Sequence, residues 1–192
     1  MENDTIATRR VNEFIEEVSS QNHAMAGAVI ALSASQAAAL GQACLHISLN
    51  LLDFMDGMIA NQIDTLVQIK SQLLHWCNRD ANAIAEFVTL REAGLGLAGK
   101  RLLCKAPGQV GQLSVQAAAI LKAARPLVNE RVKDDLEMSI SLLTGTARAA
   151  MLLLDSNLRH WPNQDLLAAF EPILSDLEFG IDKINPLKRI RA

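Results

Sequence analysis

A long stretch without charged side chains limits this chain more than any other feature. From Val18 to Leu52 there is no Asp, Glu, Lys or Arg, and Ala, Gly and Ser separate the larger apolar residues. The larger residues recur at spacings of mostly three, four and seven, which is typical of a helix. A helix that is apolar on nearly every side cannot face water. The segment from Ala24 to Leu52 is therefore predicted to be a central helix, buried in the core or at a dimer interface.

The same stretch is long enough to cross a bilayer, but its composition argues against a membrane span. Bulky apolar residues are sparse, and polar side chains interrupt the run. The N-terminal residues MENDTIATRR contain no apolar segment of the kind found in secretory signals. We therefore expect a soluble, cytoplasmic protein without a membrane partner. The interrupting residues are Ser33, Ser35, Gln36, Gln42, His46, Ser48 and Asn50.

The composition indicates a single helical domain over residues 1–192. Half of the residues are hydrophobic, yet aromatic residues make up only 4% and Tyr is absent. Ala and Leu supply most of the hydrophobic side chains, which favours helices over sheets because these side chains lose little rotamer freedom in a helix. The net charge of -3 argues against a nucleic-acid partner, because phosphate contacts require a basic surface.

The cysteines and histidines are not spaced as metal ligands. Three cysteines are widely separated and lie on predicted helices, so they are expected to be free, buried thiols. Four histidines are not paired at ligand spacing either. We expect no metal and no tightly bound cofactor. These residues are Cys44, Cys77 and Cys104, and His23, His46, His75 and His160.

Apolar residues at helical spacing predict an all-α bundle of about six or seven helices around the central one, with no strand and no internal repeat. Several residues mark their boundaries. Pro107-Gly108 predicts a turn, and Pro126 is expected to kink or split a helix. Gly94 begins a glycine-rich segment that is predicted to be the end of a long helix. The predicted helical segments are Thr5–Ser20, Ala24–Leu52, Met58–Ala93, Lys100–Lys105, Val110–Val132, 134–160 and Asn163–Ile184.

Several short motifs follow one another in a characteristic order. One protein family shares a PGGGSVAAL motif that is preceded by the pattern FLxxLA. The residues AMAGAVIAL of Ala24–Leu32 align with the first motif without a gap, and FIEEV of Phe14–Val18 matches the second. The same register continues to His46–Asn50, which falls on NLTIG. Weaker matches are Arg79–Ala83 to EDAxA, Ala123–Leu127 to AxxVPL, Lys133–Leu136 to SDL, and Asn157 to the closing asparagine of NVxxN.

By these motifs and their order, roughly from Val11 to Leu158, the chain resembles the cyclodeaminase domain of formiminotransferase-cyclodeaminase and the related methenyltetrahydrofolate cyclohydrolases. The resemblance implies an all-helical fold and a tight homodimer. It also implies a tetrahydrofolate derivative as substrate and therefore a folate ligand.

The resemblance suggests which residues would form the site. Asp80 and Asp135 are the catalytic candidates, because both reactions of the family require proton transfer and a carboxylate in an apolar pocket can provide it. The candidates for binding the substrate are Asn22, His23, Gly27, His46 and Asn157.

Structural roles remain open for the same residues. Asp135 follows Asp134 at the start of an apolar helix, so it is also suited to cap that helix. Asp80 is alternatively a solvent-exposed or ion-paired residue of its helix. His23 is alternatively a solvent-facing residue, and His46 a hydrogen-bonded histidine of the core or interface.

The sequence departs from the family at the expected folate contact. The family has a glycine-rich turn that brings backbone N–H groups close to a ligand. This chain keeps only one residue of that turn, Gly27. The family also has lysines after the central helix, which are suited to bind an anionic folate tail. This chain has Leu51, Leu52 and Asp53 in their place. Two functions therefore remain open, a folate one-carbon enzyme and a catalytically degenerate relative that acts as a dimeric binding or assembly protein.

Overall fold

The computed structural model describes residues 10–20, 25–51 and 57–191, and within these ranges the chain is all-α. Two short 3-10 helices, η2 (Arg125–Leu127) and η3 (Glu130–Val132), connect α4 to α5. The predicted fold class is therefore confirmed. The α-helices are α1 (Val11–Ser20), α2 (Ala26–Asn50), α3 (Gly57–Glu92), α4 (Gly96–Ala124), α5 (Lys133–His160) and α6 (Gln164–Ile184).

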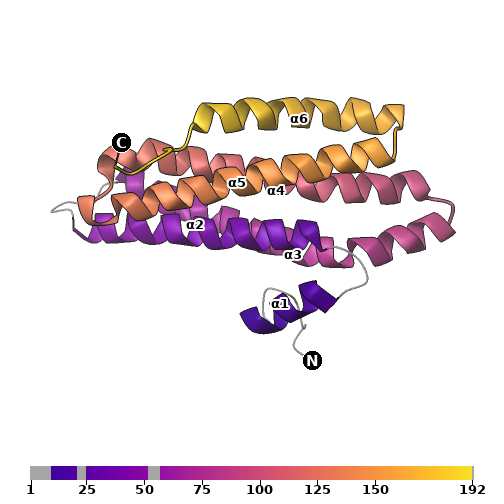
Figure 1. The fold of residues 1–192 in the computed structure, drawn as a ribbon, viewed down its shortest axis with the longest axis horizontal. Coiled ribbons are helices and arrows are strands. Elements are labelled where there is room, and N and C mark those ends of the chain that lie inside the picture. Colours follow the sequence, from indigo (N-terminus) through magenta and orange to yellow (C-terminus); the bar gives the residue numbers. More distant parts are fainter. Residues whose placement is uncertain (1–9, 21–24, 52–56, 192) are drawn as a thin grey trace.

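The helices α2, α3, α4 and α5 form a bundle in which successive helices run in opposite directions (Figure 1). Helix α6 packs along α4 and α5, and α1 lies beside the bundle, where Phe14 is its buried side chain. The hairpin of α3 and α4 extends past the first residue of α2 (Figure 1). The beginning of α2 therefore lies against the side of α3 and not at the end of the bundle.

Helix α2 packs closely on its neighbours through small residues. A methyl group on Gly41 would come within 2.3 Å of Leu121 Cδ1, so glycine is required for this close approach to α4. The opposite side of α2 is open, since Gln36, Ala43 and Ile47 are exposed. The predicted central helix is thus one wall of the bundle, buried on one side, because three neighbouring helices cover only part of its circumference.

Among the described residues, α2 is also the one helix whose length and apolar character would allow it to cross a membrane. Half of its most apolar window is buried against the rest of the chain. A core helix of a soluble protein has the same properties, so this feature alone does not indicate a membrane span.

Pro107 lies inside α4, so the predicted turn at Pro107-Gly108 is wrong. A proline has no N–H and leaves the carbonyl four residues earlier, that of Leu103, without its helical partner. In this chain the Asn157 side chain on α5 donates from Nδ2 to the Leu103 carbonyl at 2.9 Å. The helix continues through the proline because a distant residue supplies the missing donor.

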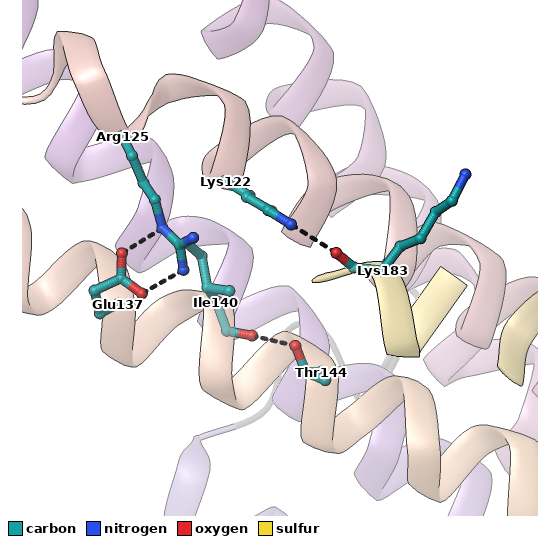
Figure 2. A network of polar contacts seen from close by, with 6 residues as sticks. All are labelled: Lys122, Arg125, Glu137, Ile140, Thr144 and Lys183. Carbon is teal, nitrogen blue, oxygen red and sulfur yellow. Dashed lines mark hydrogen bonds and ion pairs between the residues drawn. The ribbon is translucent and has the colours of Figure 1, made fainter. Parts of the chain in front are cut away.

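Pro126 ends α4, which confirms the predicted split. The helix stops at Ala124, and η2 follows with the proline in its first turn, where a missing N–H is tolerated. The Arg125 guanidinium then binds the Glu137 carboxylate of α5 through Nε–Oε1 at 2.5 Å and Nη2–Oε2 at 2.6 Å (Figure 2). This paired contact fixes the α4–α5 connection.

The end of α6 is tied to α4 by a second contact. The Lys122 ammonium donates to the Lys183 carbonyl at 2.6 Å, close to the last residue of α6 (Figure 2). The last carbonyls of a helix have no partner within the helix, so this lysine stabilises the C-terminus of α6. Asn185 then adopts a left-handed conformation with φ of 46° and ends the helix.

Candidate functional site

The first turn of α2 is bound by a carboxylate from α3. The backbone N–H of Ala28 donates to Asp80 Oδ2 at 2.8 Å. The first N–H groups of a helix have no partner within the helix, and the residue before α2, Met25, provides no side-chain cap. Asp80, which is distant in sequence, takes the place of an N-cap and puts its negative charge at the positive end of the helix dipole.

Gly27 makes this contact sterically feasible. A methyl group at Gly27 would come within 2.1 Å of Asp80 Oδ1 and 2.3 Å of its Cγ. Such distances are far shorter than van der Waals contact, so a larger residue would push the carboxylate away. Gly27 and Asp80, both expected from the sequence as site residues, are thus brought together, while their predicted substrate-binding and catalytic roles stay predictions.

Burial raises the pKa of the Asp80 carboxyl, and the hydrogen bond from Ala28 opposes this shift. The nearby Cys77 thiol is buried, and burial followed by the charge of Asp80 raises its pKa to about 12. The thiol is therefore protonated near neutral pH and is not a nucleophile. Of these two side chains, the Asp80 carboxyl is therefore the candidate for proton exchange.

Asp135 lies near the other end of α2. It is exposed in the first turn of α5, and its charge contributes to the raised pKa of Cys44, so it lies near that residue of α2. Cys44 follows Gly27 by 17 positions, which corresponds to about 25 Å along a helix. The structure therefore does not bring Asp80 and Asp135 together within one chain.

The capping role considered for Asp135 is wrong. The N-cap position of α5 is Val132, and no side chain caps this helix. Asp135 lies inside the first turn instead, where its charge interacts favourably with the helix dipole.

His46 is exposed, so it is not a core histidine. Its Nε2 lies 3.3 Å from Gln42 Nε2, and the Gln42 Oε1 accepts a hydrogen bond from Lys70 Nζ at 2.9 Å. His46 therefore lies on the C-terminal half of α2, far along the helix from Gly27.

The remaining predicted contacts divide into two groups. Asn157 is hydrogen-bonded to the Leu103 carbonyl, which gives its side chain a structural role. Asn22 and His23 lie outside the described residues, as do the departures Leu52 and Asp53. Two backbone groups of these contacts, the Ala28 N–H and the Leu103 carbonyl, were not predicted from the sequence. Backbone groups are the same in nearly every residue type, so the sequence carries no signal for them.

Two hollows of the surface lie along α6, away from the predicted residues. One groove of about 620 Å³ lies between α4 and α6, and a cavity of about 330 Å³ lies between α5 and α6. Neither is lined by a predicted site residue. Within the described ranges no group of three or more His, Cys, Asp or Glu side chains could hold a metal ion, and all three cysteines are free and buried as expected.

Together these features define an all-helical bundle with a half-buried carboxylate bound to the first turn of its uncharged helix. Residues 10–96 match the family model described as formiminotransferase-cyclodeaminase. The match confirms the expected resemblance for the part of the chain that contains α1, α2 and α3, including Gly27 and Asp80. A search of curated proteins finds no significant match.

Proposed function

We propose that this protein acts on a tetrahydrofolate derivative, as a formimidoyltetrahydrofolate cyclodeaminase or a methenyltetrahydrofolate cyclohydrolase. The observation that carries the proposal is the contact of Asp80 with the first turn of α2. This contact lies inside the segment that matches the formiminotransferase-cyclodeaminase family and involves the one glycine kept from the glycine-rich turn.

The chemistry of both reactions requires a group that exchanges a proton near neutral pH. In the cyclohydrolase reaction, a water molecule attacks the methenyl carbon and loses a proton to a base. In the cyclodeaminase reaction, the departing nitrogen takes up a proton and leaves as ammonia. Asp80 is the candidate for this role, because burial raises the pKa of its carboxyl from the ordinary value, which is the direction that proton exchange closer to neutral pH requires.

A second candidate is a catalytically inactive relative that serves as a dimeric binding or assembly protein. The Asp80 carboxylate already binds the Ala28 N–H and occupies the space above Gly27. A carboxylate in this position competes with an anionic ligand for the same end of the helix. The exposed Leu51 stands where the family has a lysine, which also favours this candidate.

A substrate assay separates the two candidates. The purified protein is incubated with methenyltetrahydrofolate while its absorbance is followed, and ammonia release is measured with formimidoyltetrahydrofolate in parallel. If the protein is the proposed folate enzyme, it should accelerate the reaction of one of these substrates, and added folate should raise its melting temperature. The absence of both effects would contradict the folate enzyme.

A further inference from the structure

The groove between α4 and α6, here called the α4–α6 groove, combines apolar walls with two lysines. Its volume of about 620 Å³ lies within the roughly 300–1,000 Å³ that is typical of small-molecule sites. Its apolar lining residues are aliphatic or very small, so they suit a ligand with an aliphatic part. These residues are Val115, Ala119 and Ala123 of α4 and Gly180 and Ile184 of α6.

Small residues of both helices give the groove its shape. A methyl group on Gly180 would come within 2.7 Å of Val115 Cγ1, so α6 lies close to α4 at this point. Ala119 and Ala123 follow Val115 at intervals of about one turn along α4, and both are exposed. Their short side chains leave the space of the groove open to a ligand.

The two lysines of the groove carry charges that no carboxylate of the described residues neutralises. The Lys122 ammonium donates to the uncharged Lys183 carbonyl (Figure 2), and the Lys183 ammonium lies 4.1 Å from the centre of the Phe179 ring. The Glu137 carboxylate in the same view is already bound by Arg125. The lining residues of the groove include no acidic side chain. An anion in the groove would therefore find a cation without a competing carboxylate.

We propose that the α4–α6 groove binds a medium-chain fatty acid. The aliphatic chain lies along Ala119 and Ala123, where it leaves water. The carboxylate accepts a hydrogen bond from Lys122, whose ammonium has three N–H donors and gives only one of them to α6. From Val115 to Ala123 the groove follows α4 for about 12 Å, which suits a medium-length chain. The proposal is independent of which function above is correct.

Both parts of this ligand are needed to match the groove. A ligand without a charge would cover the half-buried Lys122 ammonium without giving it a counterion. A small inorganic anion would leave the alanines in contact with water and would gain nothing from them. A carboxylate attached to an aliphatic chain satisfies the ammonium and the apolar walls at the same time.

Calorimetric titration of the full chain with decanoate tests the proposal. Decanoate is expected to bind at one site per chain. Hexanoate should bind at least about tenfold more weakly, because it removes four methylene groups fewer from water and the open groove covers only part of each group.

Ala119→Phe is the variant that fills the groove. The phenyl ring occupies the space above α4, so decanoate should bind at least about tenfold more weakly. Ala98→Phe is its matched control, because Ala98 is also an exposed alanine of α4. It precedes Ala119 by 21 positions, which corresponds to about 31 Å along the helix.

Lys122→Gln removes the charge that receives the carboxylate and should weaken decanoate binding about fivefold, as expected for an ion pair near the surface. Lys105→Gln is the control, since Lys105 is an exposed lysine of the same helix whose ammonium lies over the Trp76 ring. Lys122 also holds the end of α6, so circular dichroism checks the helical content and melting of each variant. The exposed Ala119 tests the groove without this complication.

Decanoate binding that both groove variants weaken and both controls retain would support the proposal. The absence of binding at millimolar decanoate, or binding that a folded Ala119→Phe variant retains in full, would overturn it. Equal losses in Ala119→Phe and Ala98→Phe would also overturn it, because they would place the ligand elsewhere. Binding that depends on Ala119 but is unchanged in Lys122→Gln would overturn the assignment of the carboxylate to this lysine.

Discussion

Gly27 on α2 and Asp80 on α3 are so close that a methyl group on the glycine would lie 2.1 Å from the carboxylate. We therefore predict that Gly27→Ala displaces Asp80 and lowers the free energy of unfolding by about 1–3 kcal/mol, the usual cost of overpacking. Urea denaturation measures this change.

Gly108→Ala is the control for this substitution. A methyl group on Gly108 would contact Ile173 and Leu154 at ordinary distances of 3.6 and 3.7 Å. Since alanine is a better helix former than glycine by about 1 kcal/mol, this variant should be at least as stable as the wild type. A Gly27→Ala variant that is also as stable as the wild type would contradict the close contact.

The pH dependence of stability reports on Asp80 directly. Burial raises the pKa of this carboxyl in the folded state, so the folded chain binds the proton more tightly than the unfolded chain. As pH rises from the unfolded pKa, near 3.8, through the folded pKa, ionisation of Asp80 lowers stability. The amide introduced by Asp80→Asn cannot ionise, so the stability of this variant relative to the wild type should increase over that window.

Asp64→Asn is the control, because Asp64 is an exposed carboxylate on the same helix. This variant removes one negative charge from α3 without changing the contact of Asp80 with Ala28. Asp80→Ala removes the acceptor of the Ala28 N–H and should be less stable than Asp80→Asn by about 1 kcal/mol. An Asp80→Asn difference that is constant with pH would show that the carboxyl is not perturbed.

The hydrogen bond of Asn157 to the Leu103 carbonyl predicts coupling with Pro107. Asn157→Ala should cost about 1 kcal/mol in the wild type, because it leaves that carbonyl without a donor. In a Pro107→Ala background the helix supplies its own N–H to the same carbonyl, so the cost should be smaller. Four urea denaturation curves complete this double-mutant cycle. Equal costs in both backgrounds would contradict the role given to Asn157.

The helices themselves could largely be predicted from the spacing of apolar residues. The segment Met58–Ala93 corresponds closely to α3, which continues through its polar residues 78–82 without a break. Gly94, with φ of 78°, follows the end of that helix as its position suggested, whereas the glycine-rich segment after it begins the next helix, α4, at Gly96. These predictions succeed because helix period and helix ends depend on nearby residues.

Features that depend on distant residues were not predictable in the same way. Pro107-Gly108 has the local pattern of a turn, but Asn157 satisfies the carbonyl that the proline leaves free. The open side of α2 depends on how many neighbours pack around it. Gly27 and Asp80 could be selected through the family resemblance, whereas their contact with each other required the structure.

The central claim is that Asp80, at the first turn of α2, exchanges the proton in a reaction on a tetrahydrofolate derivative. The most direct measurement is the rate of methenyltetrahydrofolate conversion, followed by absorbance, for the wild type, Asp80→Asn and the exposed control Asp64→Asn. The account predicts acceleration by the wild type and Asp64→Asn and a loss of at least about 100-fold in Asp80→Asn. Equal rates for wild type and Asp80→Asn, or no acceleration by the wild type with this substrate or with formimidoyltetrahydrofolate, would contradict it.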